Sequence, residues 1–245
     1  MESKEMRAVF AETLVSLAQA DERIVLIDAD LGKAAATGSF ASAFPTRKIN
    51  VGVAEANMIG VAAGMASAGK IPFAQTFACF ASRRVFDQFF ISAAYAHLGV
   101  KLIGTDPGIA AAYNGGTHMP FEDIGIMRTV PLLPILEPSD PVSLAALLRA
   151  SATFEGPTYL RMYRKPLPVR YSRDEKFEIG KSKILHDGGK GAVVLLALGG
   201  IMLGEALGAA DLLAQEGIAT TVIDVLSVKP LDSELLLSLA RTLRR

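Results

Sequence analysis

The sequence of 245 residues contains one cysteine, three histidines and no tryptophan. A single thiol cannot form an intramolecular disulfide, so Cys79 excludes a disulfide framework and is typical of a protein from the reducing cytoplasm. His97, His118 and His186 are far apart in the sequence, and together with one thiol they lack the spacing of a zinc site. The sequence therefore predicts a cytoplasmic protein without a metal site of its own.

Net charge and long apolar runs are also missing. The 25 Lys and Arg balance 25 Asp and Glu, which gives no electrostatic reason to bind nucleic acid or an anionic membrane. The start lacks the charged-then-apolar order of a signal peptide, and the longest apolar stretch, residues 58–68, is much shorter than the ~20 residues of a membrane span. We expect a soluble protein. Its mean hydropathy of +0.35 indicates surfaces buried against another chain, and hence an oligomer.

Common nucleotide and hydrolase motifs are absent. The sequence contains neither the dinucleotide fingerprint G-x-G-x-x-G nor the P-loop G-x-x-x-x-G-K-[ST], and it has no G-x-S-x-G nucleophile elbow. These absences weigh against nicotinamide, nucleoside-triphosphate and serine-hydrolase chemistry.

What the first 165 residues do contain is an alternation of short apolar runs with helical patterns. The β-rich runs are residues 24–27, 49–53, 71–77, 100–105, 132–136 and 158–162, and the helical segments are 6–20, 54–68, 81–98, 121–129 and 140–153. Such alternation predicts an α/β fold, with a parallel six-stranded sheet and helices on both faces.

The composition changes after residue 165. Residues 166–182 are rich in charge and proline, as in a linker that runs over the surface. Strand patterns at 192–198 and 219–225 then alternate with helical patterns at 202–215 and 232–243. We therefore predict a first domain over residues 1–165, a linker over 166–182, and a partial second α/β domain over 183–245 that is incomplete.

Residues that follow the predicted strands are the candidates for a functional site, because ligands of parallel sheets bind beyond the carboxyl ends of the strands. These candidates are Asp30, Glu55, Phe77, Phe80, the loop 106–118 with His118, and residues 161–164. Ordinary structural roles also explain them: an acid in the first turn of a helix, two aromatics in a core, and a histidine that makes a structural hydrogen bond. Local context alone leaves both interpretations open.

Seven short motifs follow one another in a set order between Arg7 and Asp232. They occupy residues 52–55, 62–64, 69–73, 76–84, 116–118, 156–161 and 228–232. In this order they resemble the transketolase family and correspond to its pyrimidine-binding domain and the beginning of its C-terminal domain. The resemblance implies the thiamine diphosphate-binding fold for the first domain.

The resemblance also implies thiamine diphosphate as the cofactor and gives roles to individual residues. Glu55 and His118 are the implied catalytic residues: Glu55 hydrogen-bonds N1′ of the pyrimidine, favouring the imino form that deprotonates the thiazolium C2, and His118 faces the reacting hydroxyls of the substrate. The implied cofactor contacts are Asp30, Glu55, Phe77, Phe80 and Arg83, and the implied substrate contacts are Arg7, Asp106, Asn114, His118 and Arg161.

Two positions depart from the family pattern. Asp106 stands where a histidine is common, and Tyr113-Asn114 stands where an acidic pair is common. A carboxylate beside a substrate phosphate is repulsive unless it is paired. Either the acceptor is not an ordinary phosphorylated aldose, or Arg7 and Arg161 neutralise Asp106.

The Gly-Asp-Gly…Asn motif, with which the family binds the diphosphate and Mg²⁺, is also absent. The resemblance therefore implies an N-terminal transketolase subunit as partner, homodimerisation through the pyrimidine domain, and sugar or sugar-phosphate substrates. We predict the C-terminal subunit of a two-chain transketolase. The alternatives are a thiamine enzyme like the deoxyxylulose-phosphate synthases or the beta subunits of 2-oxoacid dehydrogenases, and a non-catalytic regulatory subunit.

Overall fold

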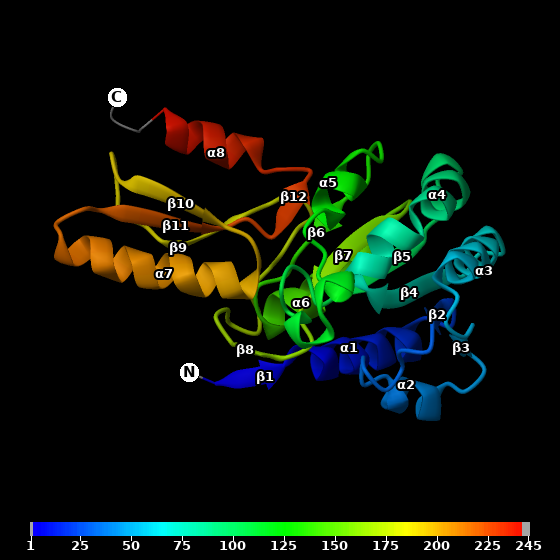
Figure 1. The fold of residues 1–245 in the computed structure, drawn as a ribbon. Helices are drawn as coiled ribbons and strands as arrows, with labels where there is room; N and C mark the ends of the chain where they lie inside the picture. Colours follow the sequence, from blue (N-terminus) through cyan, green and yellow to red (C-terminus); the bar gives the residue numbers. More distant parts are fainter. Residues whose placement is uncertain (1, 242–245) are drawn as a thin grey trace.

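The computed structural model describes residues 2–241 and contains a large sheet, a small sheet and a two-stranded ribbon (Figure 1). All six predicted strands lie in the large sheet, and each pairs with its neighbours among them in parallel. In spatial order they are β6 (Ile135–Leu136), β7 (Thr158–Met162), β5 (Lys101–Thr105), β4 (Ile71–Phe77), β2 (Ile24–Asp28) and β3 (Lys48–Asn50). The predicted α/β fold is confirmed.

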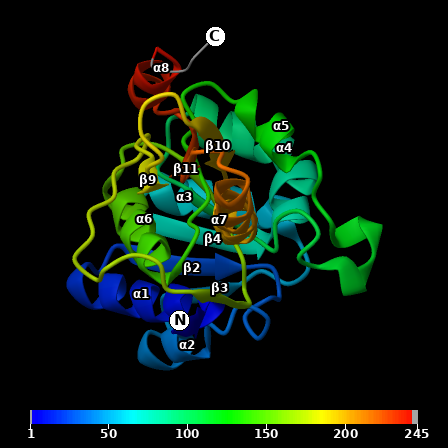
Figure 2. The ribbon, with the colours of Figure 1, turned by 90° about the vertical axis from the view of Figure 1, so that its left-hand side faces the viewer.

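Helices cover both faces of this sheet, as the fully apolar strands require. Leu26 and Phe73 point to one face, where they pack against α1 (Met6–Ala20) and α6 (Pro141–Thr153). Their chain neighbours Ile27 and Ala74 point to the other face, toward α3 (Glu55–Ser67) and α5 (Asp123–Arg128). Figure 2 shows α1 and α6 on one side of the sheet and α5 with the short helix α4 (Phe86–Gln88) on the other.

A seventh strand, β12 (Ser227–Lys229), extends the sheet from the far end of the chain. It pairs antiparallel with β6, and the amide of Glu137 donates to the carbonyl of Leu226 at 2.9 Å. The sequence did not predict this strand, because three residues carry no readable alternation. β6 itself is shorter than predicted, since Leu132 has φ +57° and Pro134 precedes the strand.

The predicted helix over residues 81–98 is broken into three pieces. A π-helical turn (Phe80–Arg84) is followed by α4 (Phe86–Gln88) and by a second π-helical segment (Phe89–Tyr95). Between the first two pieces, Val85 has φ −114° and ψ 2°. The Ser82 hydroxyl donates to the carbonyl of Ala78 at 2.8 Å. Such π turns are rare and are frequent at functional sites. The short helix α2 (Gly38–Ala43) was also not predicted.

Residues 166–182 connect the two units and also pack into the fold. β8 (Pro166–Pro168) pairs antiparallel with β1 (Ser3–Glu5), and neither strand was predicted. Tyr171 is buried, and its amide donates to the carboxylate of Asp140, which also caps α6 by accepting from the amide of Ser143 at 2.7 Å. The sequence predicted that this segment runs over the surface, but part of it is buried in the fold.

The second unit is a small three-stranded sheet, drawn in Figure 1 with one helix below its strands and another above them. The strand order is β10 (Val193–Ala197), β11 (Thr220–Asp224) and β9 (Lys183–His186), and the helices are α7 (Gly199–Gln215) and α8 (Ser233–Ala240). The two predicted strands, β10 and β11, pair in parallel, and the antiparallel β9 was not predicted. The last helix was predicted to reach residue 243, which lies outside the described residues.

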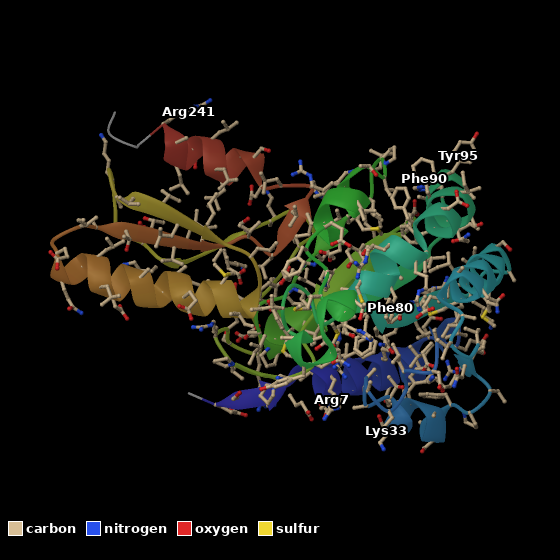
Figure 3. The ribbon with its side chains drawn as sticks, viewed as in Figure 1. Arg7, Lys33, Phe80, Phe90, Tyr95 and Arg241 are labelled. Carbon is tan, nitrogen blue, oxygen red and sulfur yellow. The ribbon has the colours of Figure 1, made fainter. Side chains whose placement is uncertain are left out.

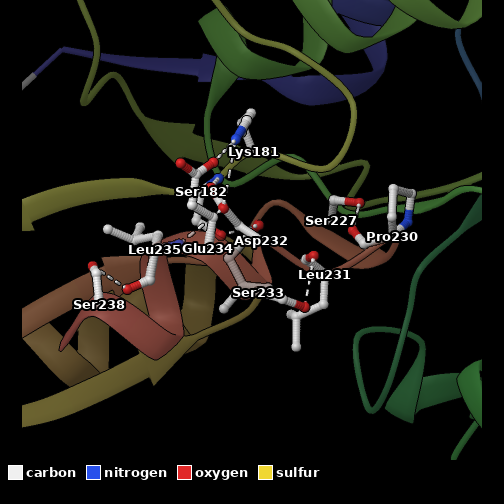
Figure 4. Close-up of polar contacts among 11 residues, drawn as sticks. Lys181, Ser182, Ser227, Pro230, Leu231, Asp232, Ser233, Glu234, Leu235 and Ser238 are labelled. Atoms are coloured by element: carbon white, nitrogen blue, oxygen red, sulfur yellow. Dashed lines mark hydrogen bonds and ion pairs between the residues drawn. The ribbon is translucent and has the colours of Figure 1, made fainter. Parts of the chain in front are cut away.

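Polar contacts fasten the beginning of α8 to the end of the connecting segment (Figure 4). The Asp232 carboxylate accepts from the amides of Leu235 at 3.2 Å and Ser182 at 3.1 Å, and Lys181 donates to Glu234 at 3.1 Å. This cap satisfies free amides of the first turn and fixes where α8 begins. Among residues 2–241, no helix is long and apolar enough to cross a membrane.

Candidate active site

The predicted site residues come together at the carboxyl edge of the large sheet. Parallel strands bring the segments after β2, β3, β4, β5 and β7 to the same edge, and these segments carry Asp30, Glu55, Phe80, Asp106 and Arg164 respectively. The candidate functional side chains of this edge therefore lie in the segments that follow the strands.

Glu55 is the first residue of α3, and its carboxylate is buried, with 3% of the side chain exposed. The chain enters the helix through a tight turn in which Gly52 has φ +75°. A position in the first turn is favourable for an acid, because the free amides of the helix carry partial positive charge. Both carboxylate oxygens accept from Nη1 of Arg84, at 2.8 and 2.9 Å.

Three rings form a cluster beside this carboxylate. The centroids of Phe77 and Phe80 lie 6.0 Å apart, and the His118 ring lies 5.6 Å from Phe77 and 5.1 Å from Phe80, all edge to face. His118 comes from the 3₁₀ turn Gly116–His118, and its Nδ1 lies 2.9 Å from the hydroxyl of Thr117. Phe77 is buried, as one interpretation of the sequence allowed, and Phe80 is half-buried, but both rings also pack against an imidazole.

A cavity of about 520 Å³ opens at this cluster. It is lined by Cys79, Phe80, Arg83, Arg84, Thr117 and His118. Arg83 shapes its wall by donating to the carbonyl of Thr117 at 2.9 Å and by pairing with Glu122 at 2.9 Å, which ties the loop of His118 to the π-helical turn. Burial raises the pKa of the Cys79 thiol, so this residue is not a reactive thiolate. In Figure 3 the broken helix runs from Phe80 to Phe90 and Tyr95.

Several buried polar groups at this edge lack a hydrogen-bond partner among the described residues. They are both side-chain polar atoms of Gln75 and the hydroxyls of Thr76 and Thr105, which lie at the ends of β4 and β5. Buried polar groups are almost always paired in proteins, and exceptions concentrate where a ligand or water completes the site. The end of these strands therefore has the character of a binding site.

Asp30 and Asn50 link the first two loops of the edge. The amide of Asp30 donates to Oδ1 of Asn50 at 3.1 Å, and Nδ2 of Asn50 donates back to the Asp30 carboxylate at 3.1 Å. The same Oδ1 accepts from the amide of Gly52 at 2.9 Å. Asp30 is exposed and has φ +62°. Asn50 therefore positions both Asp30 and the turn that leads to Glu55.

Arg7 and Arg164 converge on one acceptor. Nη1 of Arg7 donates to the carbonyl of Ala34 at 3.3 Å, and Nη1 of Arg164 donates to the same oxygen at 3.4 Å. Arg164 also pairs with the buried carboxylate of Asp106 and lies 4.9 Å from the ring centre of Phe77. The charge of Asp106 is thus neutralised by Arg164, rather than by the two arginines that the sequence suggested.

Arg161, a predicted substrate contact, is instead buried within the fold. Its Nε lies 2.7 Å from a carboxylate oxygen of Asp123, and its Nη1 donates to Glu137. Tyr159 completes the group by donating to Asp123 at 2.9 Å. Burial raises the pKa of Glu137 to about 7, against the attraction of Arg161. This network satisfies the guanidinium internally and leaves 8% of it exposed, so the structure does not bring Arg161 to the cavity.

Asn114 is exposed on the 3₁₀ turn Ala112–Asn114. Two side chains that contact the site residues were given no role from the sequence: Arg84, and Arg164, which was only part of the candidate segment 161–164. Each had a signal: Arg84 closes the motif of residues 76–84, and Arg164 is the last of the residues 161–164 that follow a strand. Their roles depend on which carboxylate each pairs with, and this pairing is set by the tertiary structure.

Comparisons with known proteins agree with this architecture. Residues 2–170 match the family "Transketolase, pyrimidine binding domain", and residues 180–245 match "Transketolase, C-terminal domain". The fold and the two matched domains define a member of the thiamine-enzyme superfamily with a pyrimidine-binding domain. The chain belongs to the transketolase family.

One similar relative is the 6-deoxy-6-sulfo-D-fructose transketolase subunit SqwH of Clostridium sp. (strain MSTE9), which is 48% identical over 97% of this chain and 73% of the relative. Human transketolase is 32% identical over 96% of this chain and 37% of its own length. Among solved structures, a split gene transketolase, described as an inactive beta4 tetramer, has a TM-score of 0.88 and 40% identity over 98% of this chain and 77% of the other.

Family membership implies dependence on thiamine diphosphate, and the residues present fit one half of that cofactor. A buried carboxylate next to an aromatic face, beside a cavity, suits a planar aminopyrimidine that donates a hydrogen bond. No group of three His, Cys, Asp or Glu side chains within residues 2–241 could hold a metal ion. The fit described above therefore concerns the pyrimidine.

Proposed function

We propose that this chain is the C-terminal subunit of a two-chain transketolase, which transfers a two-carbon ketol unit from a ketose to an aldose or aldehyde. The proposal rests on a cavity lined by Phe80, His118 and Arg84, with Phe77 packed against the first two rings and the buried Glu55 carboxylate bonded to Arg84. A fold without a reaction requires neither that acid nor that imidazole there. When bound, thiamine diphosphate would supply the nucleophilic carbon of the reaction, C2 of its thiazolium ring. In this proposal residues 1–165 form the pyrimidine-binding domain, 166–182 the connection, and 183–245 the C-terminal domain.

The chain's own residues then have distinct tasks. Glu55 would share a proton with the ring nitrogen N1′ of the pyrimidine, and Phe77 and Phe80 would exclude water from its ring. Thr117 engages Nδ1 of His118, which leaves Nε2 free to exchange a proton with a substrate hydroxyl. Arg83 contributes by holding the histidine loop. Asp30 and Asn114 are both exposed and keep their predicted contacts to cofactor and substrate in this proposal.

A partner chain is part of the proposal. Mg²⁺ and the diphosphate are assigned to an N-terminal transketolase subunit, because the described residues offer them no ligand cluster. Exposed apolar residues surround the site, among them Val53, Ile109, Tyr113 and Phe121, and such a rim suits a protein interface. Ile91 and Tyr95, exposed on the broken helix, suit homodimerisation through the same domain. The single buried cysteine suits the cytoplasm.

The proposed substrate is a ketose with an anionic group at its far end. Arg7 and Arg164 provide two guanidinium groups within reach of one point, and guanidinium binds phosphate or sulfonate oxygens well. Asp106 takes part of the charge of Arg164, and Glu5, 2.7 Å from Arg7, takes part of the charge of Arg7. The two carboxylates weaken the site for a dianion more than for a monoanion. The name of the relative SqwH makes 6-deoxy-6-sulfo-D-fructose a donor to test beside sugar phosphates.

The test is reconstitution with the N-terminal subunit. We expect micromolar binding of thiamine diphosphate with Mg²⁺ by calorimetry in the complex and little binding by the isolated chain. The complex should transfer a ketol unit from 6-deoxy-6-sulfo-D-fructose or fructose 6-phosphate to an aldose phosphate. Decarboxylation of pyruvate instead would favour a deoxyxylulose-phosphate synthase or a 2-oxoacid dehydrogenase, and a complex without cofactor binding would favour a regulatory subunit.

The variant Glu55→Gln tests the catalytic assignment. We expect turnover of the complex to fall by about 10²-fold or more, because general acid–base help at the pyrimidine is lost. Glu12→Gln, at an exposed position of α1, is the matched control and should leave turnover unchanged. If Glu55→Gln retains near-normal turnover and normal hydrogen–deuterium exchange at C2 of bound thiamine diphosphate, Glu55 has only a structural role.

A further inference from the structure

Arg84 lies between Glu55 and the cavity of the candidate site. The Glu55 side chain is 3% exposed, whereas that of Arg84 is 46% exposed, so the guanidinium is the layer that separates the carboxylate from solvent. Arg84 lines the cavity and Glu55 does not. Any ligand that reaches the carboxylate from the cavity must therefore first meet Arg84.

The guanidinium also covers the face of Phe80. Its Cζ atom lies 3.9 Å from the centre of the Phe80 ring, while its Nη1 donates to both oxygens of Glu55 at 2.8 and 2.9 Å. A planar group that stacks on an aromatic face and donates to a carboxylate is a chemical analogue of an aminopyrimidine. Arg84 thus makes both contacts that a bound pyrimidine needs from this chain.

We propose that Arg84 is an internal competitor of thiamine diphosphate: it occupies the pyrimidine contacts of Glu55 and Phe80 in the cofactor-free subunit and must swing into solvent when the cofactor binds. The inference rests on the proposed function, in which Glu55 receives the pyrimidine. Arg84 is able to move because it ends the π-helical turn and is half exposed.

In this role, the Arg84 side chain stabilises the cofactor-free protein and weakens the binding of the cofactor. In the cofactor-free chain it neutralises a buried carboxylate, and removal of the cation would leave that charge without a partner. During cofactor binding the same contact must be broken, so its removal would help binding. A residue that merely supported Glu55 from behind would have effects of the same direction on both quantities.

The experiment measures both quantities in the assembled two-subunit complex. The variants are Arg84→Met, Arg84→Lys and the control Arg23→Met, which removes an exposed pair with Asp21 far from the site. We expect Arg84→Met to lower the melting temperature of the cofactor-free complex by about 2–5 °C and to bind thiamine diphosphate about 5- to 10-fold more tightly in calorimetry. Arg84→Lys should be intermediate, because it keeps the charge and loses the stacking, and Arg23→Met should leave cofactor affinity unchanged.

A double variant shows whether the competition runs through Glu55. In a Glu55→Gln background, Arg84→Met should change cofactor affinity by less than about twofold, because the ion pair between the two side chains is already lost. Equal or weaker cofactor binding by both Arg84 variants, with normal binding by the wild type, overturns the inference and leaves the proposed function intact. A wild-type complex that binds no thiamine diphosphate overturns both.

Discussion

At the scale of single residues, Arg161 and Arg164 are only three positions apart in the sequence and yet have different roles, one in the fold and one at the open edge of the sheet. Arg161 lies in β7, and its guanidinium is enclosed by Asp123 and Glu137. Arg164 follows the strand, remains partly exposed, and faces Asp106 and the ring of Phe77. A buried charge that is paired in this way serves the fold, whereas a charge at the open edge is available to a substrate.

The two arginines therefore predict different outcomes for the same substitution. In the two-subunit complex, Arg164→Met should raise KM for a ketose with an anionic end by about 10-fold or more, since one charge-assisted contact is lost. Arg161→Met should instead lower the free energy of unfolding by about 3–5 kcal/mol, because Asp123 and Glu137 lose their cation. Steady-state kinetics and urea unfolding measure the two effects, and a kinetic defect confined to Arg161→Met would reverse the assignment.

At the scale of elements, the centre of the sheet has no spare volume where β5 passes beneath the site. A methyl group on Gly104 would lie 2.7 Å from the Tyr159 hydroxyl and 3.0 Å from Cα of Ala78. Both neighbours are fixed, since Tyr159 is fully buried and bonded to Asp123. The glycine thus allows β5 and β7 to carry a large ring between them.

Gly104→Ala should lower the free energy of unfolding of the isolated chain by about 1–3 kcal/mol through overpacking. Gly60→Ala is the matched control, because Gly60 lies in α3 and a methyl group there meets nothing within 4 Å. It should raise stability by about 0.5–1 kcal/mol through helix propensity. Denaturant titrations of both variants decide the matter, and equal effects would show that the close approach to Tyr159 is relieved without cost.

Elements also show which parts of the fold can be predicted from sequence. The six parallel strands were predictable because most of them are buried runs rich in apolar residues, and the site was predictable as an edge because parallel strands end together. The break at Val85 was not, since the apolar positions of residues 81–98 fit an unbroken helix as well. The partners of Glu55 and Asp106 were also not predictable, because ion pairing depends on how distant segments are packed.

At the scale of the whole molecule, buried polar groups join the two units. Asp224, at the end of β11, accepts hydrogen bonds from the hydroxyls of Ser139 and Tyr171, which belong to the large domain and to the connection. Burial raises the pKa of Asp224 to about 6. The ionised form of this carboxylate is therefore disfavoured in the folded protein.

The stability of the chain should depend on pH through this group. The folded pKa of about 6 lies above the ordinary value of 3.8, so the contribution of Asp224 is fully present below pH 3.8 and is lost as pH rises through 6. The free energy of unfolding should thus fall by about 2–4 kcal/mol over this window. Asp224→Asn should flatten the profile there in urea titrations from pH 4 to pH 8, and an unchanged profile would contradict the assignment.

The seventh strand of the sheet has a consequence for where this protein can be divided. The outermost parallel strand, β6, is covered by residues that come ninety positions later, from β12. A fragment that stopped at the connection would therefore keep every residue of the candidate cavity and yet present a bare sheet edge, which is a template for pairing with other chains. The large sheet thus contains a strand from beyond the connecting segment. A protein shortened at that segment should self-associate rather than remain monodisperse.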